Sequence, residues 1–153
     1  MMASLLQDMH VRWTPDLSVG STLLDTHNRR MFDRLGEADG VLDAAASGVD
    51  HVDLAVWLSG TLDRLEVLLE EEERELAAVG YPELPFHRQL HGRARARMQA
   101  MRSHLEKRPG PVLLELLMRE SCAELAVWLM RHVQDADKLF APYVDARFRI
   151  ASP

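Results

Sequence analysis

The sequence is poor in features that mark several classes of protein. Its single cysteine, Cys122, has no partner for an intrachain disulfide, which is typical of a protein in a reducing compartment. Basic residues number 18 against 24 acidic residues, a net charge of −6. Such a charge repels a phosphate backbone, so we expect no nucleic-acid partner.

Long apolar runs are also missing. No stretch approaches the ~20 consecutive apolar residues that a membrane helix needs. The N-terminal residues 1–11 carry Asp8 and His10 and have neither a basic start nor a long apolar run, unlike a signal peptide. We therefore expect a cytoplasmic protein with no membrane partner.

The pattern that is present is helical. Apolar residues recur three, four and seven positions apart in four stretches, separated by breaks rich in glycine and proline. No stretch alternates like a strand, and 153 residues suit one domain, 1–153. The fold class is therefore all-α, an up-down-up-down antiparallel four-helix bundle over residues 21–145. We expect an irregular arm at 1–20, helices at 21–46, 51–79, 83–107 and 112–143, and a tail at 146–153.

Histidines occupy the apolar faces of these helices. His87 and His91 lie four residues apart on one helix face, so both rings could reach one metal ion. Such a pair alone is a weak signal, because the spacing arises by chance in many helices. His27 and His132 lie on the apolar stripes of two other helices, and the joint placement near helix midpoints predicts a shared site.

The fourth stripe carries Glu72 instead of a histidine. An unpaired carboxylate that faces a core is costly unless it is neutralised, paired or bound to metal. Its neighbours Glu70, Glu71 and Glu73 point elsewhere, because each residue rotates by ~100° about the axis, and we expect them on a solvated face.

Imidazole and carboxylate ligands suit iron, zinc, copper or manganese, and a carboxylate can bridge two ions. An aspartate of the last helix, Asp135 or Asp137, could complete such a set. Ideal helix geometry favours Asp135, three residues after His132, because a spacing of five swings Asp137 ~140° around the axis.

Several motifs occur in a specific order. They are Trp13 with the stretch Leu-Ser-Val-Gly at 17–20, Asp-Thr-His at 25–27, Gly-Tyr-Pro at 80–82 leading to His-Arg-Gln-Leu-His at 87–91, and Trp-Leu-Met-Arg-His at 128–132 continuing to Asp-Lys-Leu at 137–139. In this order and spacing the chain resembles the bacterial hemerythrin-like proteins, also called bacteriohemerythrins. Members of that family are non-heme diiron proteins that bind dioxygen in a four-helix bundle.

The resemblance implies two non-heme iron ions joined by an oxo or hydroxo bridge, with no heme. It implies metal ligands at His27, Glu72, His87, His91, His132 and Asp137. The imidazoles of His87, His91 and His132 would hold the first iron, and that of His27 would hold the second. Glu72 and Asp137 would bridge the two ions. The choice of Asp137 over Asp135 follows the family spacing and requires a local distortion near the end of the last helix.

The sequence departs from the family at Leu68, where the family has a histidine four residues before the bridging glutamate. The second iron would then keep one imidazole, from His27. Three outcomes follow: an exogenous ligand fills the open position, the second ion binds weakly and leaves a mostly mononuclear site, or the metal is lost. We expect the first, because the other ligands and both bridges remain.

The expected function is binding of dioxygen or a similar diatomic ligand, for sensing oxygen or redox state. The expected partners are this ligand and a downstream signalling domain or protein. One alternative is a diiron oxidase or peroxidase-type enzyme, although the sequence lacks the Glu-x-x-His pair of ferritin-like diiron enzymes. Another is an inert bundle whose histidines satisfy core hydrogen bonds. We do not expect an enzyme.

Overall fold

The computed structural model describes residues 12–48 and 52–144, and every regular element within these ranges is helical. The elements are η1 (Pro15–Leu17), α2 (Thr22–Gly36), α3 (Ala38–Ser47), α4 (Leu54–Ala78), α5 (Leu84–Glu106), α6 (Pro111–Asp135) and η2 (Asp137–Leu139). The all-α prediction is confirmed. In the part of the chain that is described, no helix combines the length and apolar character needed to cross a membrane.

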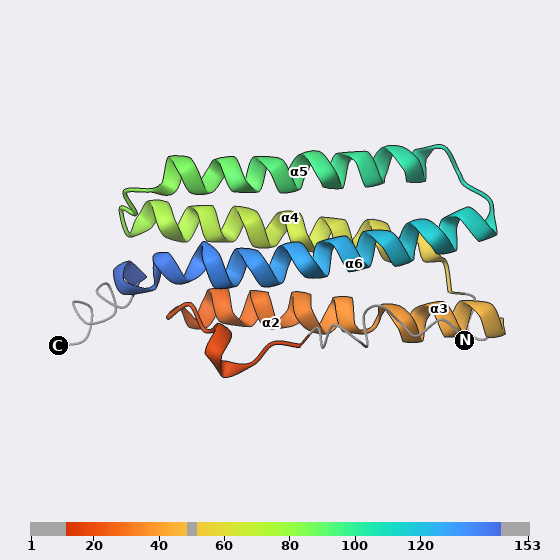
Figure 1. The fold of residues 1–153 in the computed structure, drawn as a ribbon, viewed down its shortest axis with the longest axis horizontal. Helices are drawn as coiled ribbons and strands as arrows, with labels where there is room; N and C mark the ends of the chain where they lie inside the picture. The colour runs from red at the N-terminus through yellow and green to blue at the C-terminus, as the bar shows by residue number, and fades with distance from the viewer. Residues whose placement is uncertain (1–11, 49–51, 145–153) are drawn as a thin grey trace.

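The helices pack lengthwise as rods (Figure 1). Helices α4, α5 and α6 run side by side, and α2 and α3 follow one another along the remaining edge. The long helices turn one stripe of buried residues inward, because these residues recur at spacings of three and four. On α4 the fully buried members of this stripe are Leu58, Leu62, Leu65, Leu69 and Leu76.

A tight turn sets the register between α4 and α5. Gly80 has a φ of 68°, a left-handed conformation that favours glycine, and it follows the last turn of α4. The amide of Tyr81 donates to the carbonyl of Leu76 over 3.0 Å, which closes the helix end. Because α5 then begins at Leu84, its first two turns lie beside the last two turns of α4.

The first predicted helix, 21–46, is wrong as a single element. It divides at Glu37 into α2 and α3. Gly36 is the last residue of α2, and its low helix propensity makes it a poor residue to continue the helix. The amide of the next residue, Glu37, donates to the carbonyls of both Asp33 and Arg34. The Ser21 side chain caps α2 by accepting from the Leu24 amide over 3.2 Å.

The last predicted helix, 112–143, is also wrong at its C-terminal end. Helix α6 ends at Asp135, and Ala136, whose amide still donates to the carbonyl of His132, has φ −109° and ψ −51°, a distorted right-handed conformation. The 3-10 turn Asp137–Leu139 follows. The local distortion that Asp137 requires therefore lies at Ala136. The predicted tail, the first part of the predicted arm and residue 51 lie outside the described residues.

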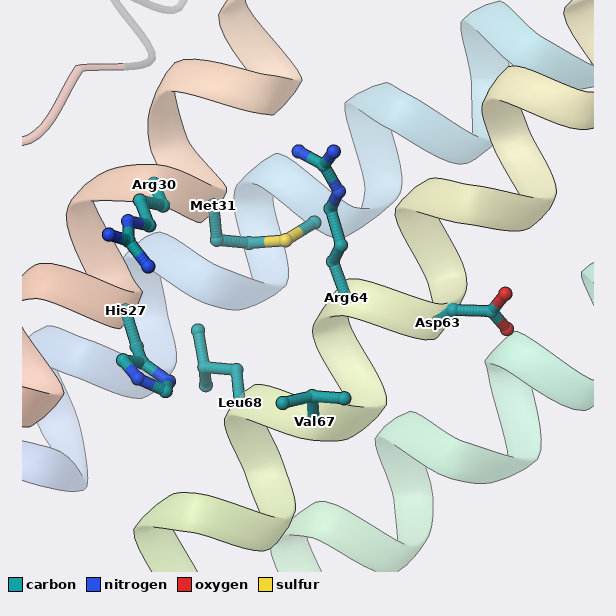
Figure 2. Close-up of a pocket in the computed structure, with 7 residues that line it drawn as sticks. All are labelled: His27, Arg30, Met31, Asp63, Arg64, Val67 and Leu68. Atoms are coloured by element: carbon teal, nitrogen blue, oxygen red, sulfur yellow. The ribbon is translucent and has the colours of Figure 1, made fainter.

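Helices α2 and α4 are in contact along much of their length. Across this contact the side chain of His27 on α2 faces that of Leu68 on α4 (Figure 2). The arm before α2 is fixed by Asp25, whose carboxylate accepts from the Ser18 hydroxyl over 2.5 Å and from the Val19 amide over 2.8 Å.

Candidate metal centre

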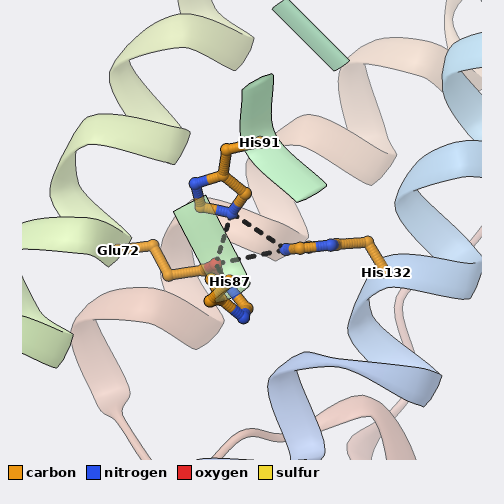
Figure 3. Close-up of side chains that lie close together, drawn as sticks. All are labelled: Glu72, His87, His91 and His132. Carbon is orange, nitrogen blue, oxygen red and sulfur yellow. Dashed lines mark hydrogen bonds and ion pairs between the residues drawn. The ribbon is translucent and has the colours of Figure 1, made fainter. Parts of the chain in front are cut away.

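Three helices bring four buried side chains together (Figure 3). Glu72 comes from α4, His87 and His91 from α5, and His132 from α6. One ligand atom from each lies within 4.8 Å of all the others. Sequence reasoning singled out all four of these residues.

The Oε1 atom of Glu72 is the centre of this group. It lies 2.6 Å from Nε2 of His87, 2.9 Å from Nε2 of His91 and 3.2 Å from Nε2 of His132. The Nε2 atoms of His91 and His132 are themselves 3.0 Å apart. Three ring nitrogens thus converge on one carboxylate oxygen inside the protein.

Asp137 lies at the same place. It is fully buried, and its Oδ1 atom is 2.8 Å from Nε2 of His132 and 3.4 Å from Nε2 of His87. The 3-10 turn after α6 carries it there, which a continuous helix could not do. Asp135, the alternative that ideal geometry favoured, is exposed and lies outside the group.

The contact between His91 and Glu73 fixes the tautomer of His91. Nδ1 of His91 lies 2.7 Å from Oε1 of Glu73, and since a carboxylate only accepts, Nδ1 carries the proton. In the neutral ring Nε2 then offers a lone pair toward Oε1 of Glu72. Two acceptors at 2.9 Å repel unless a proton or a metal ion lies with them.

Oxygen atoms of the two carboxylates are left without donors. Oε2 of Glu72 and Oδ2 of Asp137 are buried and make no hydrogen bond with any residue that the structure describes, whereas Oδ1 of Asp137 pairs with His132. Buried polar atoms are nearly always satisfied, so these two unpartnered oxygens beside three imidazoles fit the binding of a cation. Nitrogen and carboxylate donors together suit iron, zinc or manganese. The residues therefore fit a metal ion.

Burial and neighbouring charges shift the pKa values of the residues in the site. Burial disfavours ionised Glu72, but the contacts with His132 and His87 outweigh it and hold the pKa of Glu72 well below the usual value. Burial and the charge of Glu72 raise the pKa of Asp137 to about 8. Burial lowers the pKa of His132, but the charge and hydrogen bond of Asp137 outweigh it and raise that pKa to about 10. The Asp137–His132 pair therefore retains a proton at neutral pH.

The pKa of His87 is shifted downward, in the direction opposite to that of His132. Burial lowers its pKa more than the hydrogen bond and charge of Glu72 raise it. The ring is thus held neutral, which is the form that binds a metal ion.

The prediction that Glu73 lies on a solvated face is wrong. Its side chain is partly buried and accepts from His91 and, over 2.7 Å, from Nη1 of Arg95. Nε of Arg95 also donates to Glu66 over 2.6 Å. Burial raises the pKa of Glu73, but the bonds from Arg95 and His91 bring it below the usual value. No local sequence pattern identifies this role, because it depends on how α5 packs against α4.

Aromatic rings enclose the imidazoles. Trp128, one turn before His132 on α6, stacks on that ring with centroids 4.5 Å apart and planes 15° apart. Phe140 and Tyr81 pack edge-on to His87 at 5.7 Å and 6.4 Å. These contacts restrict the ring orientations and limit access of water to the group.

His27 lies apart from the four clustered ligands. It is half-buried on α2 and borders a cavity of about 500 Å³ together with Leu68 (Figure 2). Leu68 is one turn before Glu72 on α4 and is buried. An apolar side chain therefore stands opposite His27 where a second imidazole would face it.

The fold and these contacts define a class: a helical protein with a buried imidazole and carboxylate site for a cation. The hemerythrin HHE cation-binding domain matches residues 19–144, and the chain belongs to this family. The matched range contains all six predicted ligands, and the resemblance seen in the sequence is confirmed. No curated protein sequence matches the chain.

Proposed function

We propose that the site holds non-heme iron and that the protein binds dioxygen or a similar small diatomic ligand there, as a sensor of oxygen or redox state. The observation that carries the proposal is the convergence of three buried imidazoles on buried carboxylates whose other oxygens have no donor. Iron would supply reversible redox chemistry and coordination positions open to small ligands.

Two ions are part of the proposal. His87, His91 and His132 would hold the first, with one oxygen each from Glu72 and Asp137. The other oxygen of each carboxylate accepts from no described residue, so Glu72 and Asp137 could also contribute to holding the second ion. His27 would be the sole imidazole on that side.

The side of Leu68 is where an exogenous ligand would enter. Leu68 offers no donor atom, so the protein leaves a position open there, and the adjoining cavity provides space. An open position of this kind favours sensing over stable storage of oxygen. The change in ligation would be transmitted through α2 and α4, which carry His27 and Leu68 and pack against each other.

The proposal includes the arrangement of the chain around the site. We infer an up-down-up-down antiparallel four-helix bundle in a single domain, located in the cytoplasm. A downstream signalling domain or protein would receive the signal.

A second candidate function is an oxidase or peroxidase activity at the same site. The cavity beside Leu68 favours it, because a substrate could approach the open position. Neither titratable candidate on the cavity lining is dedicated to such a reaction, because His27 is assigned to the metal and the Asp63 carboxylate accepts from Arg102. Turnover of hydrogen peroxide by the iron-loaded protein would separate the two functions.

The test is a titration of the iron-loaded, reduced protein with dioxygen, followed by absorption spectroscopy. We expect a spectral change on oxygen addition and rapid autoxidation. Leu68→His should slow autoxidation by restoring the imidazole, whereas Leu68→Met, which keeps the volume and stays apolar, should not. A wild-type oxygen adduct as persistent as that of Leu68→His would contradict sensing, and no spectral response would contradict oxygen binding.

A further inference from the structure

The cavity between α2 and α4 has a composition that the metal site does not explain. It measures about 500 Å³, within the usual range for small-molecule sites. Helix α2 lines the cavity with His27, Arg30 and Met31. Helix α4 lines it with Arg64, Val67 and Leu68.

Two exposed cationic side chains, those of Arg30 and Arg64, border this cavity. Among the described residues, neither Arg30 nor Arg64 makes an ion pair or a hydrogen bond. Of the described residues that line the cavity, only Asp63 is acidic, and its carboxylate points away (Figure 2) to accept from Arg102 over 2.7 Å. A chain with a net charge of −6 thus keeps a locally positive cavity.

The inner part of the cavity is apolar. Met31 and Leu68 are both 3% exposed and form its floor, while half-exposed Val67 stands at the side. The ring of His27 points toward Leu68 (Figure 2), and none of the described residues bonds to it. Polar groups at the rim and hydrocarbon inside make the cavity amphipathic.

We propose that this cavity binds a small monocarboxylate with a short apolar chain. A guanidinium group offers parallel donors that match the two oxygens of a carboxylate, and Arg30 and Arg64 are free to provide them. The chain of the ligand would lie against Met31, Leu68 and Val67. Inorganic phosphate could satisfy the arginines but would leave this hydrocarbon floor uncovered.

The proposal does not depend on iron. The lining residues that bind the carboxylate come from outside the group of three imidazoles, Glu72 and Asp137. Metal-free protein should therefore bind the ligand, and this separates the proposal from the function proposed above.

The test is calorimetric titration of the full chain with hexanoate, with hexanol and inorganic phosphate as matched probes. We expect hexanoate to bind both iron-loaded and metal-free protein, and to bind at least about tenfold more tightly than either probe. Arg30→Gln and Arg64→Gln should each weaken hexanoate binding about tenfold. Val67→Trp should fill the cavity and abolish binding, and its exposed position preserves the fold.

The matched control is Arg119→Gln, which removes the same charge from an exposed site on α6. It should leave hexanoate binding unchanged. Equal affinity for hexanoate and phosphate, insensitivity to Arg30→Gln and Arg64→Gln, binding only to the iron-loaded protein, or no binding of hexanoate would each overturn the proposal.

Discussion

Nδ1 of His91 and Oε1 of Glu73 lie 2.7 Å apart, on the side of the imidazole that faces away from the other ligands. The same carboxylate oxygen is 2.7 Å from Nη1 of Arg95. A carboxylate held in this way fixes the ring of a ligating histidine and increases its basicity. Glu73 is thus a positioning residue for His91.

Replacing Glu73 tests this relationship. Glu73→Ala should weaken binding of ferrous iron or of a cobalt(II) probe about 10- to 100-fold, because His91 loses the group that orients it. Chelator competition measures the affinity. Glu70→Ala is the matched control, since Glu70 is exposed on the same helix and should have no effect. Equal affinities for the two variants would show that Glu73 does not position the ligand.

The two aspartates near the end of α6, Asp135 and Asp137, should differ sharply in their effect on metal affinity. Asp137→Asn removes a buried carboxylate from the ligand group and should lower metal affinity by about tenfold or more. Asp135→Asn changes an exposed residue and should leave affinity unchanged. Metal titrations followed by the absorption of cobalt(II) measure both variants. A loss confined to the Asp135 variant would mean that the wrong aspartate has been placed at the metal.

The apparent affinity for metal should increase as the pH rises. The pKa of His132 is raised to about 10 and that of Asp137 to about 8, so the metal-free site holds protons at neutral pH. A metal ion must displace them, and its apparent affinity should rise between about pH 6 and pH 8. Calorimetry in two buffers of different ionisation enthalpy detects the released protons. An affinity that is constant over this interval, with no proton release, would contradict the assignment.

Alkaline pH should destabilise the fold through Cys122. Burial raises the pKa of this thiol from 9.0 to about 12, so the folded protein keeps a proton that the unfolded chain loses. This contribution to stability is intact below about pH 9 and falls as pH rises toward 12. Urea unfolding of wild type and Cys122→Ala at pH 8 and 10 measures the difference, with the wild type expected to lose more stability. Parallel losses in the two proteins would exclude the thiol as the cause.

The sequence could predict the part of the site that depends on regular helix geometry. The four-residue spacing of His87 and His91 and the position of Glu72 on an apolar stripe were sufficient for the α4 and α5 ligands. Asp137 could not be predicted in this way, because an ideal helix turns it away from His132. Its position depends on the distortion at Ala136, which only the family spacing suggested.

Contacts between helices account for what the sequence left out. Glu73 was predicted on a solvated face because its environment is created by Arg95 and His91 of a neighbouring helix. The break at Glu37 was missed because the apolar stripe continues through it. His27 was predicted on an apolar stripe of its helix, where the structure leaves it half-buried, and the sequence could not indicate the cavity that it lines together with Leu68.

The most direct test of the metal site is the iron content of the protein after anaerobic loading with ferrous iron and gel filtration. Wild type should retain up to two ions per chain. Glu72→Leu should retain almost none, and circular dichroism would verify that it remains helical. A wild-type protein that elutes without iron, or a folded Glu72→Leu variant that retains as much iron as wild type, would contradict the claim that these buried imidazoles and carboxylates form an iron site.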